Sequence, residues 1–254
     1  MHKGRLLFIF LAVFGAGLYG APNTLPPVLD IAQSVSLTVV VDPAHGGGDW
    51  GVSARGILEK DITLKAGKAI KQKLEKSDPY VNVLLTRNDD SFVPPAERAG
   101  LANNNKAVAF ISLHCDYSAN QLTEGYKVYY TAGVDAGARK NKAEVVEWSK
   151  VQDSHINESV RLASFISQYM QASLIPETGA AGNNEANSTV PGKYRKEKSA
   201  ALVPLEGVDM PAVVIELGNL NNSNDASYLK DDKALNSIAY HIKEAMSYFL
   251  KDIK

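Results

Sequence analysis

The stretch VVVDPAHGGG, from Val39 to Gly48, contains a histidine with unusual neighbours. Three valines lead into Asp42 and Pro43, and His45 is followed at once by three glycines. One interpretation is a turn that contains a histidine. The other is a site where the His45 imidazole contacts a metal or a substrate, because glycines leave the backbone around it bare enough for a large molecule to approach.

Three further side chains that can bind a metal or carry a proton follow apolar runs elsewhere in the chain. His114 ends the run AVAFISLH, Glu216 follows PAVVI, and Glu59 comes directly after GVSARGIL, where a loop leads into a helical pattern. Two imidazoles and one carboxylate are a usual ligand set for catalytic zinc, which keeps a fourth position open for water. A further carboxylate can take the proton of that water.

Each of these residues also has a purely structural interpretation. Strand-end histidines such as His114 are often hydrogen-bonded structural residues. An acid such as Glu59 is favoured in the first turn of a helix by the helix dipole. Glu216 is harder to explain in this way, because an unpaired carboxylate at the edge of a core is energetically unfavourable. The combination of all four favours a shared site.

Strand and helix patterns alternate along the chain, which predicts how these residues are positioned. Such alternation is typical of a single α/β domain with a mostly parallel, twisted sheet flanked by helices, and its sites form at the carboxyl ends of the strands. We expect strands at 37–42, 80–86, 107–114, 124–131 and 211–218, and helices at 59–76, 93–105, 157–174 and 235–250.

Composition excludes some classes of partner. The formal net charge of −1 gives no electrostatic reason to expect binding to nucleic acid. The single cysteine, Cys115, cannot form an internal disulfide. Side chains alternate between the two faces of a strand, so Cys115 should lie opposite His114 and belong to the core.

The N-terminus has the layout of a secretory signal peptide. Basic residues precede the apolar run LLFIFLAVFGAGLYG, and small residues follow it. This run is shorter than the roughly 20 residues of a transmembrane helix. We expect a signal peptide over residues 1–21 without a defined cleavage point, a linker over 22–36 and a catalytic domain over 37–254. Such a protein would be exported to the periplasm or the cell exterior, with no stable membrane anchor after cleavage.

The motifs VVVDPAHGGGDWG, EKDITL, FISLHCD and PAVVIELGNLNN, in this order, resemble the zinc-dependent N-acetylmuramoyl-L-alanine amidases of bacterial cell walls. The resemblance extends from Leu37 to the C-terminus. It implies a zinc ion (Zn²⁺) held by His45, Glu59 and His114, with Glu216 as the catalytic carboxylate. It also implies that the substrate is peptidoglycan, cleaved at the amide between the lactyl group of N-acetylmuramic acid and the first L-alanine of the stem peptide.

Two questions stay open at this stage. A zinc peptidase or deacetylase acting on wall material, or an inactive wall-binding module, would retain similar motifs. The segment Thr131–His155 is either a lid over the site that a protein activator moves, or a plain surface extension. Deletion of Gly137 to Glu147 should raise basal activity if the segment is a lid and leave it unchanged if it is not.

Overall fold

The computed structural model describes residues 36–131, 152, 154–173 and 202–253. The predicted signal peptide and nearly all of the predicted linker lie outside these residues. The same is true of most of the segment Thr131–His155, so the lid interpretation falls outside the described part of the chain.

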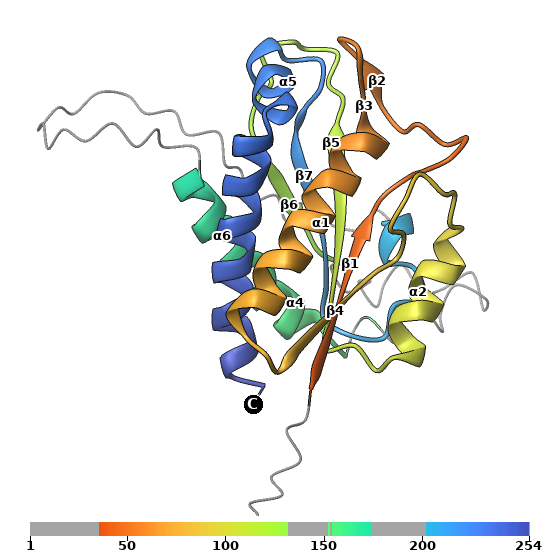
Figure 1. Ribbon diagram of the computed structural model, residues 1–254, viewed down its shortest axis with the longest axis vertical. Helices are drawn as coiled ribbons and strands as arrows, with labels where there is room; N and C mark the ends of the chain where they lie inside the picture. Colours follow the sequence, from red (N-terminus) through yellow and green to blue (C-terminus); the bar gives the residue numbers. More distant parts are fainter. Residues whose placement is uncertain (1–35, 132–151, 153, 174–201, 254) are drawn as a thin grey trace, which may run out of the picture. The chain divides into compact units, whose positions relative to one another are not determined.

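A five-stranded sheet forms the centre of the domain (Figure 1). Its spatial order is β4-β1-β5-β7-β6, in which β4, β1, β5 and β7 run parallel and β6 pairs antiparallel with β7. The three central strands β1, β5 and β7 are buried on both faces, which explains why their sequences are near-continuous apolar runs. The strands span Leu37–Pro43 (β1), Val81–Leu85 (β4), Ala109–Asp116 (β5), Lys127–Tyr129 (β6) and Ala212–Asn219 (β7).

Helices cover both faces of the sheet (Figure 1). One face packs against α1, α4 and α6, and side chains such as Val39 and Val41 point into this larger core. The opposite face packs against α2 and the short 3-10 helix η2, and Val40 points into that smaller core. The helices span Glu59–Ser77 (α1), Pro95–Asn104 (α2), Ile156–Ser173 (α4), Val203–Leu205 (η2), Ser223–Lys230 (α5) and Asp232–Lys251 (α6).

The structure confirms the predicted fold class, and it adds elements that the sequence patterns did not predict. A short hairpin of β2 (Ser53–Ala54) and β3 (Ile57–Leu58) precedes α1. Helix α5 begins where the Asn222 side chain accepts hydrogen bonds from two backbone N–H groups of its first turn. Helix α6 begins at Asp232, three residues earlier than expected, because the Asp231 side chain caps it by accepting a hydrogen bond from the backbone N–H of Lys233.

No helix among the described residues has both the length and the apolar character needed to cross a membrane.

Candidate metal and catalytic site

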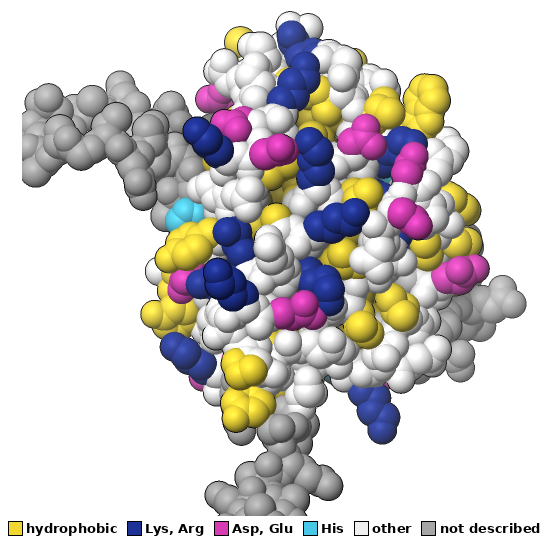
Figure 2. Space-filling model, viewed as in Figure 1, with side chains coloured by type: hydrophobic (Ala, Val, Ile, Leu, Met, Phe, Trp, Pro, Cys, Tyr) yellow, Lys and Arg dark blue, Asp and Glu magenta, His cyan; other side chains and the backbone are white. Residues whose placement is uncertain are grey.

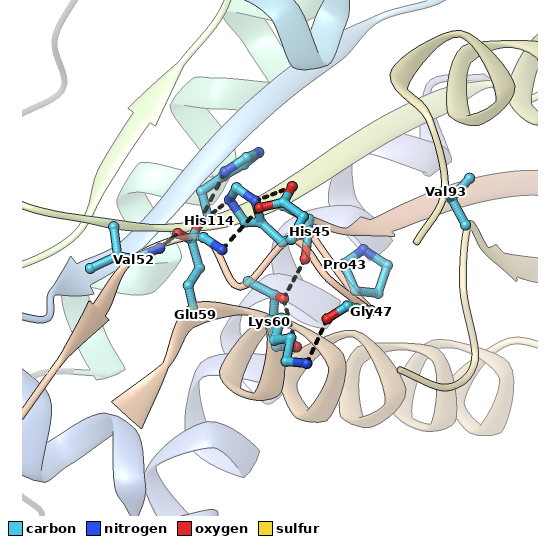
Figure 3. A network of polar contacts seen from close by, with 12 residues as sticks. Pro43, His45, Gly47, Val52, Glu59, Lys60, Val93 and His114 are labelled. Carbon is cyan, nitrogen blue, oxygen red and sulfur yellow. Dashed lines mark hydrogen bonds and ion pairs between the residues drawn. The ribbon is translucent and has the colours of Figure 1, made fainter. Parts of the chain in front are cut away.

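Three predicted ligands, His45, Glu59 and His114, converge at the carboxyl edge of the sheet (Figure 3). Their candidate ligand atoms all lie within 4.8 Å of one another. The Nε2 atom of His45 and the Nδ1 atom of His114 each lie 3.1 Å from Oε1 of Glu59. Nitrogen and carboxylate donors in this combination suit zinc, so the residues present fit the metal that the sequence predicts.

Glu59 is the first residue of α1, and backbone groups from two other segments fix its carboxylate. The N–H of Val52 donates to Oε2 at 2.7 Å, and the N–H of Cys115 donates to Oε1 at 2.9 Å. The residue is almost fully buried, with 2% of its surface exposed. A buried carboxylate held in this way has little freedom to turn away from the two histidines, which argues against a role limited to the helix dipole.

His45 is aimed by the loop that follows β1. Its φ of 63° lies in the left-handed region that non-glycine residues rarely adopt. Reciprocal backbone hydrogen bonds between Gly46 and Asp49, at 2.8 and 3.1 Å, close the loop behind it. The carboxylate of Asp49 lies 2.8 Å from Nδ1 of His45. A proton on Nδ1 donated to Asp49 leaves the lone pair of Nε2 directed at the candidate metal position, as is usual for metal-binding histidines.

A buried ion pair holds the base of this loop. Asp42, 1% exposed, contacts Arg98 at 2.6 Å and also accepts hydrogen bonds from the hydroxyls of Thr86 and Ser112. The same Arg98 guanidinium donates to the backbone carbonyl of His45 at 2.8 Å. The ion pair therefore connects the end of β1 to the backbone that carries the ligand.

We expect Asp42→Asn to lower the free energy of unfolding by about 3 to 5 kcal/mol, because the charge of Arg98 then stays buried without its carboxylate partner. Asp232→Asn is the matched control, since Asp232 pairs with Lys65 while its side chain is 75% exposed. It should change stability by less than about 1 kcal/mol. Urea unfolding of both variants measures the difference. Equal effects would show that the buried pair does not support the loop.

Gly51 allows the two ligands to approach each other. A Cβ atom at this position would lie 2.5 Å from Oε2 of Glu59 and 2.5 Å from Cδ2 of His45, and the residue has a φ of 62°. Neither ligand can move away without losing its hydrogen-bonded position. The loop therefore needs glycine here.

We expect Gly51→Ala to lower the zinc content of the purified protein, because the added methyl group displaces His45 or Glu59. Gly48→Ala is the control, since a Cβ atom at Gly48 meets nothing within 4 Å. Elemental analysis after dialysis against buffer of defined zinc concentration measures both. Full zinc content in Gly51→Ala would contradict this arrangement of the ligands.

Glu216 is adjacent to this ligand group. It lies on β7, directly beside His114 of β5 in the parallel register, so the two side chains leave the same face of the sheet. Its Oε2 atom is buried without a hydrogen-bond partner. Burial raises the pKa of Glu216 to about 7, with the nearby charges of Glu59 and Asp116 adding to the effect and those of His114 and Lys127 opposing it. A carboxyl group with this pKa can both accept and release a proton near neutral pH.

Glu59 and His45 have pKa values shifted in opposite directions. Burial alone would raise the pKa of Glu59, but hydrogen bonds to His114 and His45 outweigh it and hold the value at about 2. Burial alone would lower the pKa of His45, but the hydrogen bonds and charges of Glu59 and Asp49 raise it to about 9. The carboxylates therefore attract positive charge to this point, either as a proton or as a metal ion.

The match to known proteins agrees with this geometry. Residues 39–248 match the sequence profile of the N-acetylmuramoyl-L-alanine amidase family Amidase_3. The chain belongs to this amidase family. The family and the enzyme class predicted from the sequence motifs are thereby confirmed.

Named relatives and solved structures of this amidase family support the assignment. A probable amidase, AmiB, of Haemophilus influenzae is 27% identical over 98% of this chain, which spans 57% of the length of that relative. AmiA of Escherichia coli is 28% identical over 83% of this chain and 75% of its own length. The amidase AmiC2 of Nostoc punctiforme has a TM-score of 0.64 at 26% identity, and the match covers 85% of this chain and 98% of AmiC2.

Three residues that shape this candidate site were not singled out from the sequence. Asp49 orients His45, Gly51 leaves room for two ligands, and Lys60 ties the loop after β1 to the loop after β4. A signal for Asp49 was present, because it lies four residues after His45 in a loop closed by glycines. Lys60 gave no signal, since a lysine in the first turn of a helix is ordinarily exposed.

Proposed function

We propose that this chain hydrolyses the amide bond between the lactyl group of N-acetylmuramic acid and L-alanine in peptidoglycan, with a zinc ion held by His45, Glu59 and His114. The observation that supports this most strongly is the convergence of these three side chains beside a buried carboxylate, on the fold of an amidase family. The proposal extends to the domain division: a signal peptide over 1–21, a linker over 22–36 and a catalytic domain over 37–254.

The residues of the site have different roles in the proposed reaction. When bound, zinc supplies Lewis acidity that polarises the scissile carbonyl and lowers the pKa of water. Glu216 accepts the proton of the attacking water on its unpartnered, buried Oε2 atom and returns it to the nitrogen of the leaving L-alanine. Asp49 keeps the lone pair of His45 Nε2 available, and the backbone N–H groups of Val52 and Cys115 keep the Glu59 carboxylate in place.

The products of wall digestion test this function. Purified peptidoglycan incubated with the zinc-loaded protein should yield glycan strands with free lactyl carboxyl groups and peptides with N-terminal L-alanine, identified by mass spectrometry. Cleavage within the stem peptide would indicate a peptidase, and free glucosamine amines would indicate a deacetylase. Binding to the wall without any product would indicate an inactive module. Each of these three outcomes contradicts the proposal.

Export and activation by a partner form a second part of the proposal. Cell-wall hydrolysis requires the chain to reach the periplasm or the cell exterior, which the signal-peptide layout of residues 1–21 would provide. CwlD of Clostridioides difficile, an amidase whose fold is similar to this one at 22% identity, has been solved in complex with the GerS lipoprotein. We propose that a protein activator acts here through Thr131–His155. A deletion of Gly137 to Glu147 that stays folded and keeps unchanged basal activity would contradict this part.

A further inference from the structure

Two large aromatic side chains are exposed on the loops next to the candidate site. Trp50 follows Asp49 in the loop after β1 and is 56% exposed. Phe92 lies in the loop after β4 and is 57% exposed. Both loops leave the carboxyl edge of the sheet, where His45 and Glu59 also lie (Figure 1). Exposed aromatic rings beside a site are a common feature of ligand-binding surfaces.

The two loops are joined into one surface by Lys60. Its Nζ atom donates to the carbonyl of Gly47 at 2.9 Å (Figure 3) and contacts the carboxylate of Asp90 at 2.7 Å. Asp90 in turn accepts a hydrogen bond from the N–H of Gly47 at 2.8 Å. Lys60 is buried although it is charged, so these contacts are its means of satisfying that charge. The loops are thereby held together.

Close packing adds to this connection. A Cβ atom on Gly47 would lie 3.0 Å from the backbone nitrogen of Phe92 and 3.2 Å from its Cβ atom. The two loops therefore touch directly, and the exposed rings of Trp50 and Phe92 are presented from a common base. We call this surface, formed by Trp50 and Phe92 with the loops that carry them, the aromatic platform. Loops held together in this way lose little backbone conformational entropy when they bind a ligand.

The charges exposed around the aromatic platform are negative. The side chains of Asp49 and Asp90 are 44% and 54% exposed, and Asp89 of the loop after β4 is also exposed, whereas Lys60 is buried. In Figure 2 the Lys and Arg side chains of the visible face lie over α1 and α6 and also at the upper right, next to Asp and Glu side chains. The exposed oxygens of these carboxylates can accept hydrogen bonds from the hydroxyl and N-acetyl N–H groups of sugars.

A cation lies on the other side of the site. Lys127 of β6 is paired in register with Glu216 of β7, and its ammonium group contacts Asp116. The site therefore has exposed aromatic rings at the β1 and β4 loops, and an ion pair of Lys127 and Asp116 on the β6 side.

We propose that the aromatic platform binds the glycan strand of peptidoglycan, with the apolar faces of the sugar rings stacked on Trp50 and Phe92 and the exposed carboxylates accepting hydrogen bonds from the sugars. This inference rests on the proposed function for the identity of the substrate. It places the lactyl group at the edge of the aromatic platform nearest the zinc ligands.

Binding of peptide-free glycan strands tests the inference without any hydrolysis. The probe is a soluble oligomer of β-1,4-linked N-acetylglucosamine, a neutral sugar strand that carries neither lactyl groups nor stem peptides, titrated into the zinc-loaded protein by calorimetry. The double variant Trp50→Ala/Phe92→Ala should bind them at least about tenfold more weakly than the wild type, and each single variant should show a smaller loss. The zinc content of the double variant should be unchanged, since neither the Trp50 nor the Phe92 side chain forms an observed hydrogen bond with a zinc-ligand residue.

Tyr80→Ala is the matched control, because Tyr80 is an aromatic residue of similar exposure, 49%, immediately before β4 at the opposite edge of the sheet. It should bind glycan strands as the wild type does. On intact peptidoglycan, the platform double variant should raise KM with little change in kcat.

Two results would overturn the inference: equal glycan binding by the wild type and the double variant, or an equal loss in Tyr80→Ala. A failure of the wild type to release L-alanine-terminated peptides would instead overturn the proposed function. The two failures are distinguishable, because glycan binding is measured on strands that contain no scissile amide.

Discussion

Replacement of Glu216 by glutamine is expected to lower the rate of peptidoglycan hydrolysis by roughly a hundredfold or more, the usual scale for loss of a general acid–base group. Zinc content should stay near that of the wild type, because the three predicted ligands are intact. Glutamine is nearly isosteric with glutamate, and the carboxylate it replaces has an unpartnered Oε2 atom. The measurement pairs elemental analysis of zinc with the release of N-terminal L-alanine.

A surface substitution and a thermal melt separate this effect from damage to the fold. Glu97→Gln changes an exposed carboxylate in the first turn of α2, and both its rate and its zinc content should match the wild type. The melting temperature of Glu216→Gln should equal or exceed that of the wild type, since burial of a carboxylate that prefers to be protonated is relieved. Wild-type hydrolysis by Glu216→Gln would remove Glu216 from the mechanism.

Glu59→Ala is expected to abolish both tight zinc binding and hydrolysis. The substitution removes one of three converging donors and leaves the N–H groups of Val52 and Cys115 without their acceptor. The loss of metal, more than the loss of rate, distinguishes this variant from Glu216→Gln. The measurement is the amount of zinc bound per chain and the rate of peptidoglycan digestion, determined on the same preparation of each variant.

Asp61→Ala is the informative control for the helix-dipole interpretation of Glu59. Asp61 is also an acid in the first turn of α1, but it is exposed and is not part of the ligand group. Loss of a dipole interaction would affect both variants to a similar, small extent. If Asp61→Ala keeps its zinc and Glu59→Ala loses it, Glu59 is a ligand. Retention of zinc in Glu59→Ala together with its loss in Glu216→Gln would reverse the roles of the two glutamates.

The positions of the site residues could be predicted because they depend on the geometry of parallel sheets. His45, His114 and Glu216 are near the carboxyl ends of apolar runs, and parallel strands bring those ends to one edge. The strands β5 and β7 extend beyond His114 and Glu216, to Asp116 and Asn219, so both residues are fixed by ladder hydrogen bonds and not by loops. That rigidity was not visible in the apolar pattern.

The contacts that hold the site residues in place could not be predicted. They join segments far apart in the sequence, and the pattern of strands does not indicate which of these segments lie close together. Lys60 reaches Asp90, thirty positions away, and Arg98 reaches Asp42, fifty-six positions away. The requirement for glycine at position 51 arises only when Glu59 and His45 are both in place. The β2–β3 hairpin and α5 were missed for another reason: they are too short to show a periodic apolar pattern.

Reconstitution of the metal-free protein with zinc tests the central claim most directly. The chain is stripped of metal with a chelator, zinc is added in steps, and both bound zinc and the rate of release of N-terminal L-alanine from peptidoglycan are measured at each step. We expect the metal-free protein to be inactive, and the rate to rise in proportion to bound zinc until one ion is bound per chain. Full hydrolysis by the metal-free protein, or tight zinc binding that restores no L-alanine release, would contradict the account.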